Sequence, residues 1–229
     1  MSARVPATGP HPTERRPAIA ASLVLLDRSQ RHIRVLLGRR SQAHAFMPGY
    51  HVFPGGRRDP GDHRLPHEGA LPPADAARLK RALRTASPLA AAAVAIAAWR
   101  ELHEETGLCP VGENITPGPR LPFLPDLTNM RYMARAITPP GHVRRYDTHF
   151  FVLFADAANI DITRARSGPE LEDIGWHALD TLSGLSLAGI TQCILEEVRA
   201  RLRADPSLTA NLPVPVYRSV RQSLVRDLL

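Results

Sequence analysis

Three glutamates, Glu101, Glu104 and Glu105, lie close together near the end of an expected helix. At about 100° per residue their carboxylates share one helix face. Like charges at this spacing repel each other and destabilise a helix unless protons or cations intervene. Hard divalent cations prefer carboxylate oxygens and activate water for attack on phosphorus. The cluster therefore predicts metal-assisted phosphate chemistry, with Mg²⁺ or Mn²⁺ as the cofactor and the three glutamates as its ligands.

The helix that carries these glutamates has clear end signals. Ser87 is a suitable N-cap, Pro88 suits the first helical position, and Gly107 suits a left-handed C-terminal residue. Residues 89–99 are all apolar, so we expect this part of the helix to be buried on every side. An acidic end on a buried helix favours a functional site over the alternative, a solvated acidic face.

The run from Arg100 to Leu108 resembles the second half of the Nudix box, with Glu101, Glu104 and Glu105 at the family's glutamate positions. The first half fits from Gly56 onward, except that Asp62 stands in place of a glutamate and thirty extra residues separate it from Arg100. The resemblance implies an α/β fold, a mixed curved β-sheet sandwiched between helices.

The resemblance implies that Arg100 orients the glutamates and that Asp62 supports Arg100. The backbone carbonyl of Gly55 is implied as a further metal ligand. We expect Gly55 and Gly56, in a turn, to permit close backbone approach and unusual dihedral angles. The implied reaction is hydrolysis of a diphosphate bond by a metal-activated water.

A second segment is similar to the signature of coenzyme A diphosphatases. It runs from Leu36 to Gly56, with Gly38 in place of a threonine and Ala45 in place of an arginine. The resemblance implies coenzyme A or an acyl-CoA as substrate, split into 3′,5′-ADP and a phosphopantetheine. One alternative is an ADP-ribose or NADH pyrophosphatase. Another is a non-catalytic Nudix-like module that binds a nucleotide or nucleic acid.

Arginines at two places are candidates for substrate binding. Arg39 and Arg40 follow an expected strand, and Arg144 and Arg145 lie in an expected loop between two strands. Guanidinium groups bind phosphates through charge-assisted hydrogen bonds. Gly56 is expected to lie beside the substrate as well. Each arginine pair has a plain alternative as a solvated strand end or polar loop.

An additional acidic residue is expected in a loop before the last strand, where many Nudix enzymes have a general base or further metal ligand. Glu172 is the first choice and Glu170 the second. The base is therefore either Glu104 or an acid of this loop, and the sequence leaves both open.

The remaining elements follow from hydrophobic patterns. Residues 1–17 are expected to be a disordered leader, and residues 18–229 a single domain. The inserted segment, residues 63–87, is either a partial lid or a decoration. The other expected elements are a hairpin of strands 19–26 and 33–37, a helix at 74–85, strands at 131–138 and 148–155, a helix at 190–202 and an edge strand after residue 213.

Composition limits the other function classes. The net charge is +7, but Lys80 is the only lysine among 29 basic residues, so the charge says little about partners. There is no zinc-ligand set, basic helix or aromatic stripe, and we expect no nucleic-acid partner. No apolar run approaches the roughly 18 residues of a membrane span. Two cysteines form no disulfide framework, which favours a reducing cytoplasm. The oligomeric state stays open.

Overall fold

The nine strands in the described part of the chain belong to one mixed sheet, with the order β3-β2-β1-β6-β5-β8-β9, while β4 pairs with β1 and β7 with β2. The computed structural model describes residues 16–42, 47–112, 116–118, 120–142, 144–209, 211–220 and 223–229. Most of the expected leader, and Ala45, lie outside these ranges. The strands are β1 (Ala18–Asp27), β2 (Arg34–Arg40), β3 (His51–Val52), β4 (Gly55–Arg57), β5 (Arg131–Ile137), β6 (Tyr146–Phe154), β7 (Leu171–Ala178), β8 (Pro215–Val220) and β9 (Ser223–Leu228).

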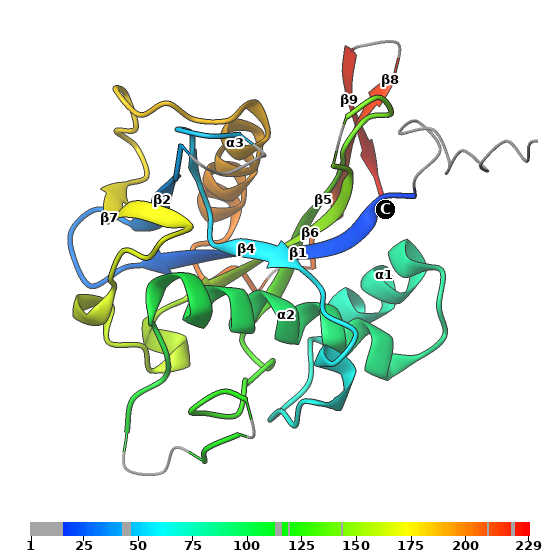
Figure 1. Cartoon of the computed structure of the whole chain (residues 1–229), viewed down its shortest axis with the longest axis horizontal. Coiled ribbons are helices and arrows are strands. Elements are labelled where there is room, and N and C mark those ends of the chain that lie inside the picture. The colour runs from blue at the N-terminus through cyan, green and yellow to red at the C-terminus, as the bar shows by residue number, and fades with distance from the viewer. Residues whose placement is uncertain are drawn as a thin grey trace, which may run out of the picture.

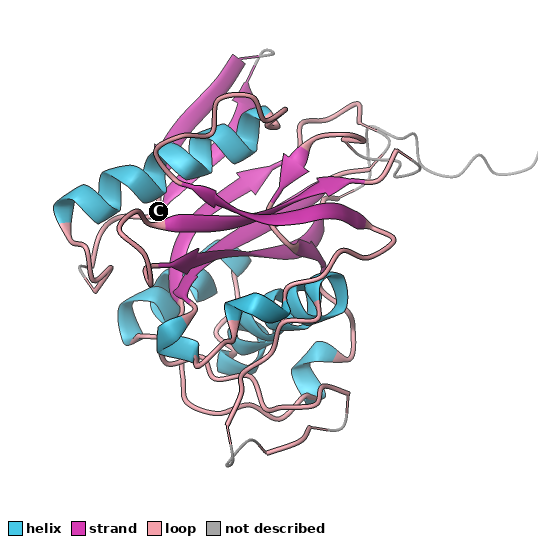
Figure 2. Ribbon diagram, turned by 90° about the vertical axis from the view of Figure 1, so that its left-hand side faces the viewer, coloured by secondary structure: helices cyan, strands magenta, loops and turns pink. Residues whose placement is uncertain are grey.

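Helices cover both faces of the sheet. The helices α1 (Pro73–Leu83) and α2 (Pro88–Thr106) lie on one side, and α3 (Gly189–Ala204) lies on the other (Figures 1 and 2). Strand β1 shows why both faces need cover, because Leu23 faces the core under α2 while its neighbour Val24 faces the core under α3. The predicted α/β/α sandwich is therefore confirmed.

The central strand β1 forms the expected hairpin with β2, with Leu26 opposite Val35. The hairpin is closed by Arg34, whose Nε donates to the buried Asp27 carboxylate at 2.8 Å. On its other side β1 pairs in parallel with β6, and β6 pairs with β5 as an antiparallel neighbour. This arrangement puts the ends of β1 and β6 next to each other, where the cavity described below opens.

Helix α2 begins and ends where the sequence predicts. The side chain of Ser87 accepts a hydrogen bond from the Ala90 amide, and Gly107 ends the helix with a φ of 70°. The expectation of burial on every side is wrong for the first turn, because Leu89 is 62% exposed. From residue 93 to residue 100 every side chain is buried. This buried stretch lies against β1 and β4.

The inserted segment adds to the core beneath α2. Leu65, Leu71 and Leu79 are buried in the same cluster as α2. The segment is also joined to a later loop, since the Glu68 amide donates to the Pro125 carbonyl at 2.9 Å. These contacts enclose one side of α2 and fix the segment at both ends.

The C-terminal part differs from the expectation in two ways. Residues 170–176 were expected to precede the last strand, but most of them form β7, and two further strands follow. The edge strand expected after residue 213 is present, but the tail forms a hairpin of two strands, β8 and β9, and β8 joins the sheet in parallel with β5. Within the described ranges no single helix is long and apolar enough to cross a membrane; α1 and α2 pass such a test only as a pair, bent by 99° at its break.

Candidate active site

A cavity of about 440 Å³ opens where the end of α2 meets β1, β4 and β6. Its acidic wall contains Glu101, Glu104 and Glu170. Basic side chains also line it, namely Arg40, Arg57, Arg100 and Arg144. The apolar part of the wall consists of Met47, Val52, Phe53, Phe150 and Ile190. A pocket of this size, with both charges and apolar walls, suits an anionic organic ligand.

Arg100 organises the acidic wall from a buried position, since its side chain is only 4% exposed. Its Nη1 donates to Glu101 Oε1 at 2.8 Å and to Glu104 Oε2 at 2.7 Å. Its Nε donates to Asp62 Oδ1 at 3.0 Å, and its Nη2 donates to the Arg57 carbonyl at 3.0 Å. Burial alone lowers the pKa of Arg100, but its acidic partners outweigh burial and raise it. Arg100 is therefore a permanently charged clamp on its neighbours.

Asp62 lies directly against Arg100, although thirty extra residues separate the two halves of the box. It sits in a short 3₁₀ helix, Asp62–Arg64, and has no exposed surface. Its second oxygen, Oδ2, accepts a hydrogen bond from the Asp59 amide at 2.7 Å. The shorter side chain of aspartate thus reaches Arg100 because the backbone around residue 62 approaches the helix.

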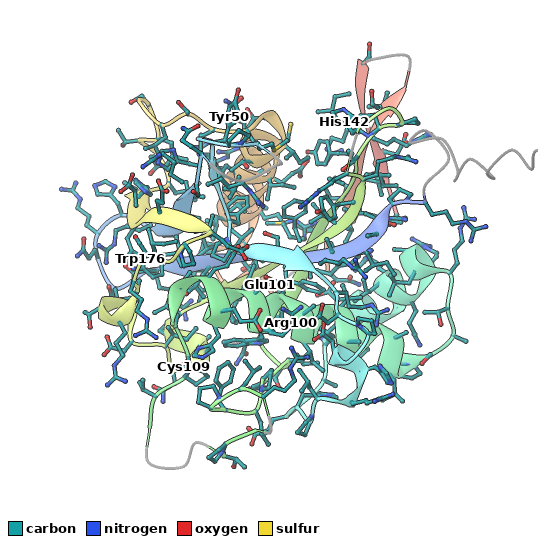
Figure 3. The ribbon with its side chains drawn as sticks, viewed as in Figure 1. Tyr50, Arg100, Glu101, Cys109, His142 and Trp176 are labelled. Carbon is teal, nitrogen blue, oxygen red and sulfur yellow. The ribbon has the colours of Figure 1, made fainter. Side chains whose placement is uncertain are left out.

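Glu101 and Glu105 lie at different depths in the protein. Glu101 lies between α2 and β4 (Figure 3), and Glu105 lies deeper, where its Oε2 accepts a hydrogen bond from the Gly55 amide at 2.8 Å. Burial, and then repulsion from neighbouring carboxylates including Glu170, raises the pKa of Glu101 to about 7 and that of Glu105 to about 8. Part of this acidic wall therefore carries protons near neutral pH.

Two glycines let backbone and carboxylate approach closely. A Cβ on Gly56 would lie 2.5 Å from the Glu101 carboxylate, and one on Gly55 would lie 2.6 Å from the Ala21 carbonyl oxygen. Both residues belong to β4, which pairs with β1, so the expected turn is partly a strand. Neither has a positive φ, so the expectation of unusual dihedral angles is wrong and close approach alone requires glycine here.

The donor atoms of this wall suit a hard divalent cation, because carboxylate oxygens are the ligands that Mg²⁺ and Mn²⁺ prefer. Among the described residues, however, no three His, Cys, Asp or Glu side chains are gathered around one point. Glu101 and Glu104 turn toward Arg100, and Glu105 turns toward the Gly55 amide. The donor set fits a cation in its chemistry, and the glutamates must turn from these partners to bind it.

The acids near β7 separate into two groups. Glu170 lines the cavity, whereas Glu172 lies outside it and forms an ion pair with Arg39, with 2.9 Å between Glu172 Oε2 and Arg39 Nη2. Of these two glutamates, the structure therefore places Glu170, the second choice from the sequence, in the acidic wall of the cavity. The sequence alone gave no means of choosing between these two glutamates, because they are only two positions apart.

The candidate substrate arginines separate in the same way. Arg40 and Arg144 line the cavity. Arg39 does not, and the Nε of Arg145 donates to the Thr138 carbonyl at 3.3 Å. None of residues 63–87 lines the cavity, so the interpretation of this segment as a lid is not supported. His142 and Cys109 lie far from Glu101 (Figure 3).

Sequence reasoning missed several lining residues. The strand β6 contributes Thr148 and Phe150, and α3 contributes Ile190 and Thr191. Alternate residues of a strand share one face, so period two was the signal that marks Thr148 and Phe150 together. The N-terminus of α3 carries no sequence signal of this kind, because its position beside the cavity depends on the path of the whole chain.

Comparison with solved structures identifies the fold. A Nudix hydrolase from Alicyclobacillus acidocaldarius matches with a TM-score of 0.60 and 24% identity over 86% of this chain and 97% of that chain. The Nudix domain of Shewanella oneidensis NrtR, solved with ADP-ribose, gives 0.49 and 16% over 82% and 90%. The M. smegmatis Nudix hydrolase RenU gives 0.48 and 15% over 82% and 88%. No protein-family model and no curated protein matches the chain. The first of these likenesses shows that the chain has the Nudix hydrolase fold.

Proposed function

We propose that this chain hydrolyses a diphosphate bond in a nucleoside diphosphate derivative, with Mg²⁺ or Mn²⁺ as cofactor. One observation carries the proposal. Arg100 donates hydrogen bonds to the buried Asp62 and to Glu101 and Glu104 at the wall of the cavity. The site combines an acidic cluster, the buried guanidinium of Arg100 behind it and further arginines around it. This combination suits a substrate whose phosphates bind together with a metal ion. The Nudix hydrolase fold supports the same reading.

The roles of the chain's residues follow from their contacts. Glu101, Glu104 and Glu105 would hold the ions, together with the Gly55 carbonyl. Bound there, such ions would lower the pKa of the attacking water and would neutralise charge on the phosphate oxygens. Arg100 serves the protein rather than the substrate, because Nε, Nη1 and Nη2 each donate to a protein oxygen.

The remaining charged side chains of the cavity bind substrate or move a proton. Arg40 and Arg144 line it and would donate to phosphate oxygens. Glu170 lies beside Glu101 closely enough to raise its pKa, and we assign it as the group that orients the water and accepts its proton. Glu104 is the alternative base; its side chain is 48% exposed.

The test of this function is the variant Glu104→Gln, which keeps the shape of the side chain and removes its charge. We expect kcat to fall by about a thousandfold, equivalent to about 4 kcal/mol of transition-state stabilisation, with an unchanged thermal midpoint. Glu196→Gln is the matched control, because Glu196 lies exposed on α3 away from the cavity. Unchanged turnover in Glu104→Gln would refute the assigned chemistry.

Coenzyme A or an acyl-CoA is the substrate we propose within this class. Support comes from the signature spacing and from Arg40, a signature residue that lies in the cavity beside apolar side chains. Products would be 3′,5′-ADP and a phosphopantetheine. A parallel assay of CoA, 3′-dephospho-CoA, ADP-ribose and NADH with each ion separates the candidates. CoA should exceed its dephosphorylated form in kcat/KM; equal values, with faster ADP-ribose or NADH cleavage, favour the runner-up. Cytoplasmic location stays a prediction.

A further inference from the structure

The strand β7, which begins just after Glu170, is joined to β2 by an irregular pairing. The register shifts by one residue between Leu37 and Arg39, so that Gly38 faces two residues of β7, Asp173 and Ile174. This is a β-bulge, and Asp173 at its centre has a φ of 47°. Bulges bend a strand and redirect the side chains next to them.

Gly38 makes room for this bulge. A Cβ at residue 38 would lie 2.5 Å from Ile174 Cδ1 and 3.1 Å from Leu171 Cβ. Position 38 is also where the chain departs from the threonine of the coenzyme A diphosphatase signature. The departure therefore coincides with a closer approach of β7 to β2 than a larger residue permits.

Arg39 holds the bulge from the side. Its Nη2 lies 2.6 Å from Asp173 Oδ2 and 2.9 Å from Glu172 Oε2, and its Nε donates to Asp173 Oδ2 at 2.8 Å. The pair with Asp173 raises the pKa of Arg39. Arg39 does not line the cavity, so these acids are its partners rather than a ligand. A planar guanidinium that binds two consecutive acids fixes the backbone between them.

The end of this clamped segment points to the active site. The amide of Ser41, the residue directly after β2, donates to the Glu170 carbonyl at 3.1 Å. Arg39 holds residues 172 and 173, and the side chain of Glu170 lines the cavity with Glu101 and Glu104. The segment from 170 to 173 is thus attached at both ends, to β2 and to the residue directly after it.

We propose that Arg39 is a positioning residue, which fixes the bulge of β7 so that the Glu170 carboxylate stays in the cavity. The inference rests on the proposed function, in which Glu170 orients the attacking water. Arg39 was expected from the sequence to bind substrate; its ion pairs assign it to the protein scaffold instead. A catalytic group held about 1 Å out of place loses much of its effect.

The test compares Arg39→Ala with Arg39→Lys in steady-state kinetics on CoA and ADP-ribose with Mg²⁺. We expect Arg39→Ala to lower kcat by about tenfold to a hundredfold with KM unchanged, because the loss is in orientation. Arg39→Lys should restore part of kcat, since an ammonium reaches one of the two acids. The matched control is Arg218→Ala, which removes an exposed arginine that pairs with Asp227 on the β8–β9 hairpin.

A double-mutant cycle separates positioning from a general structural effect. If Arg39 acts through Glu170, Arg39→Ala has no further effect on kcat in a Glu170→Gln background. A crystal structure of Arg39→Ala should show the Glu170 carboxylate moved out of the cavity. Should Arg39→Ala fail to fold, Asp173→Asn replaces it, because asparagine tolerates a positive φ and removes the charge.

Several results would overturn the inference: additive losses in the cycle, a raised KM with unchanged kcat, a thermal midpoint far below that of Arg218→Ala, or an unmoved Glu170 in the variant crystal. The two proposals fail separately. A fully active Glu104→Gln ends the proposed function, whereas an inactive Glu104→Gln beside a fully active Arg39→Ala ends the positioning role alone.

Discussion

The pair of Asp62 and Arg100 gives the sharpest test of how this split box is held together. The Asp62 carboxylate is fully buried and accepts from Arg100 Nε at 3.0 Å, from Arg100 Nη2 at 3.3 Å and from the Asp59 amide at 2.7 Å. Asp62→Ala removes both acceptor oxygens, and with them all three hydrogen bonds, and leaves the guanidinium buried with its Nε–H unsatisfied. Breaking a buried ion pair from one side costs about 3–5 kcal/mol.

The expected loss lies at the lower end of that range, about 3 kcal/mol, because Nη1 of Arg100 keeps two acidic partners. The assay is urea unfolding followed by circular dichroism at pH 7, with the free energy of unfolding extrapolated to water. Activity should fall as well, since Arg100 then holds Glu101 and Glu104 less firmly.

Asp156→Ala is the control for this variant. Asp156 pairs with Arg28, but both side chains are about half exposed, at 55% and 43%. An exposed pair contributes no more than about 1 kcal/mol. If Asp62→Ala costs no more than this control, the buried pair does not hold the two halves of the box together, and the reasoning from burial is refuted.

Three further outcomes are expected. Gly56→Ala should abolish activity with the fold retained, as measured by kcat and circular dichroism, because the new Cβ meets the Glu101 carboxylate at 2.5 Å. Without metal, the free energy of unfolding should fall as the pH rises above about 4.5, the pKa of an unfolded glutamate, and through the folded pKa values of about 7 for Glu101 and about 8 for Glu105. The reason is that a pKa raised by folding makes the folded protein most stable when these groups are protonated. Glu105→Gln should reduce this dependence on pH in urea titrations with EDTA. Leu79→Ala should cost about 3 kcal/mol in urea unfolding but leave kcat and KM unchanged, because Leu79 packs beneath α2 and away from the cavity; a changed KM would restore the lid interpretation.

The sequence predicts the elements best where local chemistry decides the structure. Ser87 and Gly107 mark the ends of α2 because capping depends on residues within one turn. The hairpin of β1 and β2 follows from alternation across a short polar turn. The acidic wall follows as well, since helical spacing alone places Glu101 and Glu104 on one side.

Features that depend on contacts between distant segments are not accessible from spacing. The choice between Glu170 and Glu172 is decided by contacts with distant residues, since Glu172 forms an ion pair with Arg39 while Glu170 lines the cavity. The structure places Arg39 outside the cavity, and the sequence could not indicate this because its acidic partners lie more than 130 residues away. The insertion has an amphipathic sequence that suits a lid as well as a core, and the packing of Leu65, Leu71 and Leu79 beneath α2 distinguishes the two.

Charge balance links the protonation of this site to the proposed binding of a metal ion. Three carboxylates, from Asp62, Glu101 and Glu104, contact the guanidinium of Arg100, and the buried Glu105 lies on the same helix end, so full ionisation would leave an excess of negative charge there. Burial, and then repulsion between carboxylates, raises the pKa of Glu101 to about 7 and that of Glu105 to about 8, so protons on these groups reduce that excess. Under the proposed function a divalent ion would compete for the same oxygens, and its binding would release those protons. Stability, pH and metal affinity are therefore coupled through one set of carboxylates.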